Sequence, residues 1–282
     1  MKRKTAVALL TALCLVAAKD VADPSIFEPG RISTAGYESH PAFSPDGKLL
    51  LFVKSNPQFG GWKMYEATRA AGGWSEPRLA NFSGEFLDAD PQFSPDGRHV
   101  YFISTRTAPD KPRKDLDIWV VSRTATGWGT PERLPAPINS EGAEWFPRIQ
   151  RDGGLYFGSD RPGGFGATDI YRAVRRRDGW KVTNLGKPVN SSGDEYELEL
   201  APNGKVAILM AARPPQTSGD LYRTIRNRKG WSEPQLLGPT INGPGLEVGP
   251  LITRDGKSLY FSSRRSDERL GDIYVAPLSA LK

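Results

Sequence analysis

The sequence predicts an all-β fold, a five-bladed β-propeller with four-stranded antiparallel blades. A turn motif recurs along the chain at similar intervals, and each interval holds several strand-like segments. The motif is Phe-Ser-Pro-Asp-Gly at residues 43–47 and again at 93–97, with weaker copies that end in Asp152-Gly153, Asn203-Gly204 and Asp255-Gly256. Successive turns lie 50, 56, 51 and 52 residues apart. A period of about fifty residues with several strands is typical of a propeller blade.

Each copy carries the same order of expected strands. An apolar first strand leads into the turn, and Asp-Gly or Asn-Gly favours a tight hairpin because these residues tolerate positive φ. Second strands are expected at residues 50–52, 100–102, 155–157, 207–209 and 259–261, and third strands begin at 63, 117, 169, 220 and 272. Fourth strands begin at Gly-Trp pairs in four copies, and in three of these a proline follows three residues after the tryptophan. Proline cannot donate inside a sheet, so the fourth strand is predicted to form the outer edge.

The fifth copy ends after its third strand, and the missing fourth strand is expected from the start of the chain. Residues 26–32 (Ile-Phe-Glu-Pro-Gly-Arg-Ile) resemble residues 74–79 (Trp-Ser-Glu-Pro-Arg-Leu) of a fourth strand. We therefore expect the segment 26–32 to complete the last blade beside residues 272–275. Closing the ring in this way also removes an exposed sheet edge. The expected division is a signal peptide at 1–18 and a single propeller domain over 19–282.

The N-terminal segment has the pattern of a secretory signal peptide. Residues 2–4 are positively charged, residues 5–18 form an apolar run, and small residues precede a cut before Lys19. The alternative, a membrane anchor, needs about 20 apolar residues, and this run is shorter. Leu13 precedes Cys14, where a lipidation signal would need a small residue. These features predict a periplasmic or extracellular protein with a cleaved signal and no membrane span.

Composition argues against several classes of function. Cys14 is the only cysteine, and His40 and His99 are the only histidines, so neither a cofactor nor a metal site is expected. Loss of residues 1–18 lowers the formal charge from +6 to about +3. No run of Lys and Arg lies beside stacking aromatics, which argues against a nucleic-acid partner. No Gly-x-Ser-x-Gly motif is present, which argues against an esterase or peptidase.

Residues 159–166 (Ser-Asp-Arg-Pro-Gly-Gly-Phe-Gly), followed by Asp169-Ile170-Tyr171, resemble the WD40-like (PD40) propeller repeat of TolB-type and OmpA-associated periplasmic proteins. The Ser-Pro-Asp-Gly turns are similar as well, and the resemblance covers nearly all of residues 19–282. It implies a propeller of the cell envelope that binds a protein or peptide. TolB itself has a further α/β domain and six blades, whereas five repeats are counted here.

Two columns of charged residues emerge when the five copies are compared. An acid stands eight residues before each turn Asp or Asn, namely Glu38, Asp88, Glu144, Glu195 and Glu247. An arginine follows the second strand in four copies, namely Arg106, Arg161, Arg213 and Arg265. Propeller topology places both columns on the face opposite the Asp-Gly turns, which predicts a ring of carboxylates that binds a cation, sugar or peptide at the channel mouth. The alternative is that each acid ties one blade to the next through backbone N–H groups or an arginine.

Departures from the repeat are further candidates for a ligand site. Trp145 and Phe146 follow one acid of the column, and Tyr196 and Glu197 follow the acid of the next blade. Exposed aromatics beside carboxylates hold sugars or peptides. The alternative is that these aromatics fill the gap between blades.

The function predicted from these features is that of a non-enzymatic, monomeric binding module for a protein or peptide partner in the cell envelope. The alternative is a five-bladed glycosidase that uses two carboxylates of the channel mouth. We also expect Arg148 and Glu199 to pair, with Gln92 in the same layer. All three occupy equivalent positions in inner strands, four residues before the turn residue, and such positions approach one another around the ring.

Overall fold

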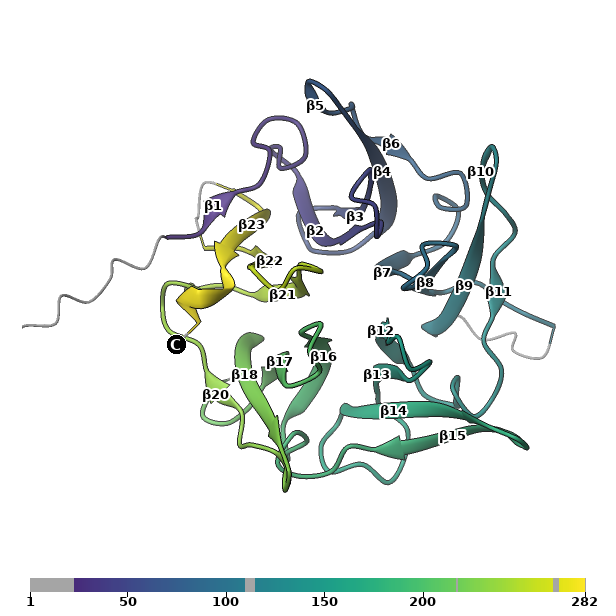
Figure 1. The fold of residues 1–282 in the computed structure, drawn as a ribbon, viewed down its shortest axis with the longest axis vertical. Coiled ribbons are helices and arrows are strands. Elements are labelled where there is room, and N and C mark those ends of the chain that lie inside the picture. Colours follow the sequence, from purple (N-terminus) through teal and green to yellow (C-terminus); the bar gives the residue numbers. More distant parts are fainter. Residues whose placement is uncertain (1–22, 110–114, 217, 266–268, 282) are drawn as a thin grey trace, which may run out of the picture.

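Five antiparallel sheets stand in a ring around a central axis, which confirms the predicted five-bladed β-propeller (Figure 1). The computed structural model describes residues 23–109, 115–216, 218–265 and 269–281. The predicted signal peptide, residues 1–18, lies outside these ranges. The described ranges contain no helix that is long and apolar enough to cross a membrane.

Each blade runs from an inner strand at the axis to an outer strand at the rim. The first blade has β2 (Tyr37–Phe43), β3 (Leu49–Ser55), β4 (Lys63–Ala70), β5 (Gly73–Trp74) and β6 (Arg78–Leu79). The second has β7 (Asp88–Phe93), β8 (His99–Ser104), β9 (Asp117–Thr124), β10 (Gly127–Trp128) and β11 (Glu132–Arg133). The third has β12 (Glu144–Ile149), β13 (Leu155–Ser159), β14 (Asp169–Arg176) and β15 (Gly179–Asn184). The fourth has β16 (Asp194–Leu200), β17 (Val206–Ala212), β18 (Asp220–Asn227), β19 (Gly230–Trp231) and β20 (Gln235–Leu236). The fifth has β21 (Glu247–Ile252), β22 (Ser258–Ser263), β23 (Asp272–Pro277) and β1 (Ser25–Ile26), followed by a 3₁₀ turn at Leu278–Ala280.

The outer strand is split into two short pieces in the first, second and fourth blades, and it is continuous in the third blade. The split blades are those with a proline three residues after the tryptophan, at Pro77, Pro131 and Pro234. Thr183 occupies this position in the third blade, where β15 pairs with β14 without a break. The missing N–H of proline therefore explains where the outer ladder is interrupted.

The N-terminal strand closes the ring, as predicted, although it is shorter than the expected segment 26–32. Ser25 pairs with Val275 and Ile26 with Tyr274, and the N–H of Phe27 donates to the carbonyl of Ile273 at 2.8 Å. The chain then leaves the sheet because Glu28 has a left-handed φ of 46° and its carbonyl accepts from the N–H of Ile32 at 2.9 Å. Closure therefore rests on few backbone contacts and on side-chain packing.

The recurring turn motif forms because serine and aspartate satisfy the backbone of the hairpin. The Ser44 hydroxyl donates to Asp46 Oδ1 at 2.5 Å and accepts from the N–H of Leu49 at 2.9 Å. Ser94 and Asp96 repeat this arrangement in the second blade. We call the face that carries these hairpins the turn side. The opposite face, which carries the loops between second and third strands, is the mouth side.

The core lies between neighbouring blades and is built largely from second strands. The equivalent residues Phe52, Phe102, Phe157, Leu209 and Phe261 are all buried. Each inner strand carries a register shift near its middle, where its pairing with the second strand is interrupted. Two residues are left unpaired in β2, β7, β12 and β21, and one residue is left unpaired in β16. These β-bulges turn selected side chains toward the axis.

Packing of Phe27 predicts how strongly the N-terminal strand stabilises the ring. Its ring lies 5.2 Å from that of Tyr260 in the fifth blade and 5.8 Å from that of Phe43 in the first, so it joins the two blades. We expect Phe27→Ala to lower the free energy of unfolding by about 3 kcal/mol because a large side chain is lost from this junction. Urea denaturation measures the change.

Phe165→Ala is the control for this prediction, since Phe165 is 48% exposed. We expect it to change stability by less than about 0.5 kcal/mol. Equal losses in the two variants would show that ring closure does not depend on the aromatic junction.

Candidate functional site

The predicted acid column is buried in the walls of the ring. Glu38, Asp88, Glu144, Glu195 and Glu247 are all fully buried. In the third blade, Glu144 accepts from the hydroxyls of Ser140 at 2.5 Å and Ser159 at 3.0 Å, and it pairs with Arg161 at 3.0 Å. Burial raises the pKa of Glu144, although Ser140 and Arg161 oppose this effect.

The predicted arginine column fixes these acids to the loops that join the blades. Arg161 donates to the carbonyls of Pro137 and Ile138 at 3.0 and 2.6 Å, in the loop that arrives from the second blade. Equivalent contacts to the preceding loop are made by Arg106, Arg213 and Arg265. In the first blade Lys54 approaches Glu38 at 3.4 Å instead. In the fifth blade Arg265 reaches Glu247 through the hydroxyl of Ser263. This geometry supports the structural alternative, in which the acids tie neighbouring blades together, and the binding role of these columns stays a prediction.

A third column, missed in the sequence, points into the axis. It lies two residues after each acid and consists of His40, Asp90, Phe146, Glu197 and Gly249. Four of the five have left-handed φ values: 50° for His40, 54° for Asp90, 48° for Phe146 and 63° for Gly249. A Cβ at Gly249 would approach the backbone of His40 to 2.8 Å, so only glycine fits at that point. Positive φ in non-glycine residues is costly and is often found at functional sites.

Three members of this axial column form a buried cluster that spans the ring. His40 Nε2 lies 3.0 Å from Glu197 Oε1 and 3.2 Å from Asp90 Oδ1. The other oxygen of Asp90 accepts from the N–H of Phe146 at 3.0 Å, and the other oxygen of Glu197 accepts from the N–H of Gly249 at 2.7 Å. Side chains or backbone groups from all five blades therefore meet in one cluster.

The cluster holds two carboxyl groups and one imidazole. Burial would lower the pKa of His40, but the charges of Asp90 and Glu197 and the hydrogen bond to Glu197 outweigh it, and the pKa is raised. Burial also raises the pKa of Asp90, with the nearby charge of Glu197 acting in the same direction. With His40 protonated and both acids ionised, the three side chains carry a net charge of about −1.

The predicted pair of Arg148 and Glu199 forms the next layer along the axis. Arg148 Nε donates to Glu199 Oε2 at 2.9 Å, and Arg148 is 1% exposed. Gln92 lies in the same layer and accepts from the N–H of Ile149, as expected. The guanidinium of Arg148 also stacks on Phe146, 3.3 Å from the ring centroid. Burial raises the pKa of Glu199 to about 7, although Arg148 opposes this effect.

A cavity of about 290 Å³ opens above the His40 cluster on the mouth side. We call it the mouth pocket. His40, Asp90 and Glu197 line its floor, and its remaining lining residues are apolar or aromatic. The aromatic wall consists of Phe59, Trp62, Trp145 and Tyr196, whose neighbouring rings lie 5.8 to 6.4 Å apart. The arrangement suits a ligand with an apolar body and a polar or charged end.

The predicted aromatic candidates divide between the pocket and the axis. Trp145, Tyr196 and Glu197 line the mouth pocket together, whereas Phe146 is fully buried and does not line it. Phe59 and Trp62 were missed because they lie in the loop between β3 and β4, outside the repeated columns. That loop has Asn56 where the other four blades have arginine. This departure from the repeat is the sequence feature that points to the loop and to its two aromatic residues.

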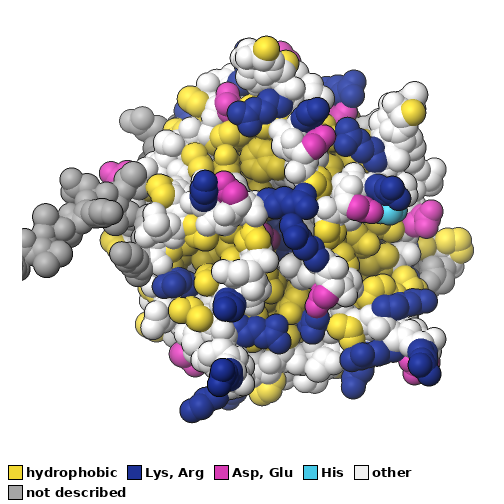
Figure 2. All heavy atoms as spheres, in the orientation of Figure 1, with side chains coloured by type: hydrophobic (Ala, Val, Ile, Leu, Met, Phe, Trp, Pro, Cys, Tyr) yellow, Lys and Arg dark blue, Asp and Glu magenta, His cyan; other side chains and the backbone are white. Residues whose placement is uncertain are grey.

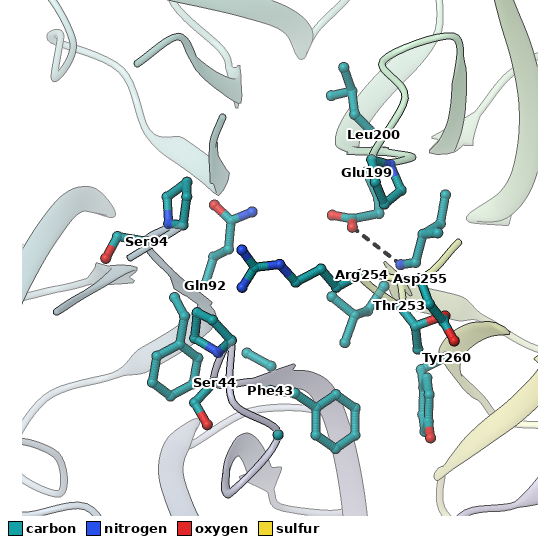
Figure 3. A pocket seen from close by; sticks show the side chains of 18 of the residues that line it. Phe43, Ser44, Gln92, Ser94, Glu199, Leu200, Thr253, Arg254, Asp255 and Tyr260 are labelled. Atoms are coloured by element: carbon teal, nitrogen blue, oxygen red, sulfur yellow. Dashed lines mark hydrogen bonds between the residues drawn. The ribbon is translucent and has the colours of Figure 1, made fainter. Parts of the chain in front are cut away.

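A second cavity, of about 480 Å³, lies on the axis at the turn side (Figure 3). Gln92 and Glu199 line its inner part, and the side chain of Arg254 extends across it toward Gln92. Phe146 and Arg148 lie buried between the two cavities, which share no lining residue. The described residues contain no group of three or more His, Cys, Asp or Glu side chains arranged to hold a metal ion.

Removal of one partner from the Arg148–Glu199 pair is expected to destabilise the ring. Arg148→Met leaves a buried carboxylate without its cation, and the free energy of unfolding should fall by about 3–5 kcal/mol. The double variant Arg148→Met/Glu199→Gln should recover part of this loss, because the remaining group is then neutral. Urea denaturation of both variants measures the coupling. A loss below about 1 kcal/mol in the single variant would contradict the pairing as a structural constraint.

The raised pKa of His40 predicts how stability depends on pH. A group whose pKa is higher in the folded than in the unfolded protein stabilises the fold when it is protonated. This stabilisation is complete below the pKa of the unfolded state, here about 6.5, and it is lost as the pH rises through the pKa of the folded state. We expect His40→Gln to remove this decrease above pH of about 6.5. Urea denaturation of the wild type and of His40→Gln across this pH range tests the expectation. A His40→Gln effect of equal size at every pH would refute the assignment.

Comparisons with known proteins find a likeness in solved structures alone. No protein-family model matches the chain, and no curated protein matches it. A gluconolactonase from Xanthomonas campestris matches with a TM-score of 0.48 and 15% identity over 90% of this chain and 85% of its own. Prolyl oligopeptidase B from Galerina marginata matches with a TM-score of 0.47 and 12% identity over 80% of this chain and 30% of its own. A puromycin-hydrolysing peptidase from Mycobacterium tuberculosis matches with a TM-score of 0.46 and 18% identity over 80% of this chain and 34% of its own. The chain thus spans about a third of the length of these peptidases, and similarity of this degree carries no argument about activity.

Proposed function

We propose that the protein is a non-enzymatic, TolB-like binding module of the periplasm or extracellular space, whose mouth pocket takes one side chain of a peptide or protein partner. The observation that carries the proposal is an aromatic-walled cavity with two carboxylates in its floor. The signal-peptide pattern and the PD40-like repeat in the sequence support the location and the class of partner.

The size of the mouth pocket favours a single side chain over a larger molecule. Its volume is about 290 Å³, at or below the lower end of the range of about 300–1,000 Å³ found for small-molecule sites. Such a cavity has room for one long side chain, with the rest of the partner lying on the rim. Aromatic residues around a desolvated pocket are typical anchors for such contacts.

Charge and wall composition favour a basic side chain. The floor holds two carboxyl groups and one imidazole, and with all three ionised it carries a net charge of about −1. Arg148 below it is paired with Glu199. Aromatic faces such as those of Trp62 and Trp145 attract a cation, with a gain of about 0.5–2 kcal/mol. The apolar stem of lysine or arginine packs well on such a wall.

One observation favours a second candidate, a glycosidase. Asp90 and Glu197 both contact the same nitrogen of His40, which places two carboxylates close together at the base of an aromatic pocket. Retaining glycosidases use carboxyl groups about 5–5.5 Å apart. Both acids, however, are 5% exposed, lie against the imidazole of His40 and accept from backbone N–H groups. This pair differs from the acid column on which the sequence-based alternative relied.

Selection from a random peptide library tests the proposed function. We expect wild-type protein to enrich peptides with Lys or Arg at one position, and replacement of that residue by norleucine to weaken binding because the charge is lost. Trp145→Ala and Trp62→Ala should each weaken binding by about 2 kcal/mol, or roughly 30-fold. Fluorescence polarisation with the selected peptides measures these changes.

Trp180→Ala is the matched control, since Trp180 lies at the rim on β15 and lines neither cavity. It should bind as wild type does. Enrichment without a basic residue, or unchanged binding by both pocket variants, would refute the proposal. Turnover of a 4-nitrophenyl glycoside that is lost in Asp90→Asn and Glu197→Gln would establish the glycosidase instead.

A further inference from the structure

Basic residues are concentrated on the turn side of the disc. The hairpins between first and second strands and those between third and fourth strands lie on this side, and together they carry fourteen Lys and Arg residues. Figure 2 shows Lys and Arg side chains, in dark blue, spread widely over this face. The inner hairpins contribute Lys48, Arg98, Arg151, Lys205, Arg254 and Lys257, and the outer hairpins contribute Arg69, Arg123, Arg175, Arg176, Arg177, Arg226, Arg228 and Lys229. All fourteen are exposed. The same segments contain five acids, Asp46, Asp96, Asp152, Asp178 and Asp255.

The repeat itself places part of this charge. Lys or Arg follows the Asp-Gly or Asn-Gly turn in four of the five copies, at Lys48, Arg98, Lys205 and Lys257. The aspartates of these turns are also exposed, but they accept hydrogen bonds from the backbone of the turn. Asp46, for example, accepts from the Ser44 hydroxyl and from the N–H of Lys48, contacts that lower its pKa. The carboxylates of these turns are therefore engaged by the turn itself, whereas the cations that follow them form no ion pair with any described residue.

These cations are not neutralised by the fold. None of the fourteen forms an ion pair within 4.0 Å of a carboxylate among the described residues. They exceed the acids of the same hairpins by nine, whereas residues 19–282 as a whole carry a formal charge of about +3. The positive charge is therefore segregated to one face, and the remainder of the propeller is net acidic.

The distribution of the cations favours a broad anionic surface as the partner. They surround the centre of a flat disc instead of following one groove (Figures 1 and 2). At the edge, Arg69, Arg175 and Arg226 cover the tryptophans at 74, 180 and 231, with the charged carbons 5.5 to 5.7 Å from the ring centroids. These rings are thus not presented for base stacking, which nucleic acids would need.

We propose that the turn side docks on an anionic phospholipid surface and that the mouth pocket then faces away from it. The contributions of Lys and Arg residues near such a surface to the binding free energy add, and each side chain raises the affinity about fivefold. Arg151 and Arg254 flank the axial cavity at the centre of the face, where a lipid phosphate could be held between them. This inference does not depend on the proposed peptide site, which lies on the opposite side of the ring.

Sedimentation with lipid vesicles tests this inference on the propeller, residues 19–282. The first vesicles contain phosphatidylcholine with phosphatidylglycerol, and the second contain phosphatidylcholine alone. We expect binding to the first only, with an affinity that falls as salt increases. The variant Lys48→Gln/Arg98→Gln/Lys205→Gln/Lys257→Gln should bind the anionic vesicles more weakly by about two to three orders of magnitude.

A control variant removes exposed cations from the mouth side alone: Lys63→Gln/Lys187→Gln/Arg264→Gln. It should bind as wild type does, because these residues lie away from the turn side. Thermal unfolding of both variants checks that each remains folded. Equal loss in the two variants, or equal binding to both kinds of vesicle, would overturn the proposal. Capture by heparin without binding to anionic vesicles would also overturn it, in favour of a soluble polyanion.

Discussion

The inner strands of the five blades crowd a single axis, so a polar side chain there must find its partner on another blade. An unpaired buried polar group is costly. His40 of the first blade meets this requirement with Asp90 of the second and Glu197 of the fourth. Backbone N–H groups at Phe146 and Gly249 complete the cluster from the third and fifth blades. Repeat proteins of the open solenoid type are stabilised by neighbours alone, whereas this ring also depends on contacts across its centre.

Periodicity was sufficient to predict most of the fold and one axial contact. Residues at equal offsets from the turn occupy equal depths in their blades, which is why Arg148 and Glu199 could be expected to meet. The closing strand was predicted on the same grounds, but its length was not, because the turn at Glu28 depends on local backbone geometry. Proline positions predicted an outer edge, and the structure adds that each proline interrupts that edge.

The candidate site was less predictable for two physical reasons. The axial column is created by β-bulges with left-handed φ, and such a bulge is not encoded by the alternation of apolar and polar residues. Phe59 and Trp62 lie in a loop of the first blade, so comparison of the repeats could not align them with other residues. Trp145 and Tyr196 were identified because they replace smaller residues within an aligned column. Tertiary closure of the ring then brings all four aromatics into one wall.

Repetition has different consequences in the interior and on the surface of this ring. In the walls, each carboxylate of the acid column has its own supporting contacts, as Glu144 has Arg161, so five copies of the column build five separate joints. On the turn side, the repeated cations remain exposed and their fields add, so the same regularity produces one extended charged face.

At the axis the five blades contribute different residues, and pairing there is incomplete. Two carboxylates share the one imidazole of His40, while the nearest guanidinium, that of Arg148, is bound to Glu199. These two carboxyl groups line a cavity with aromatic walls instead of packed protein. Within the blades, lysine or arginine pairs with buried acids. At the axis, a cation brought by a ligand would play the same part. The same rule for buried carboxylates therefore accounts for the joints of the ring and for the charge preference proposed for its pocket.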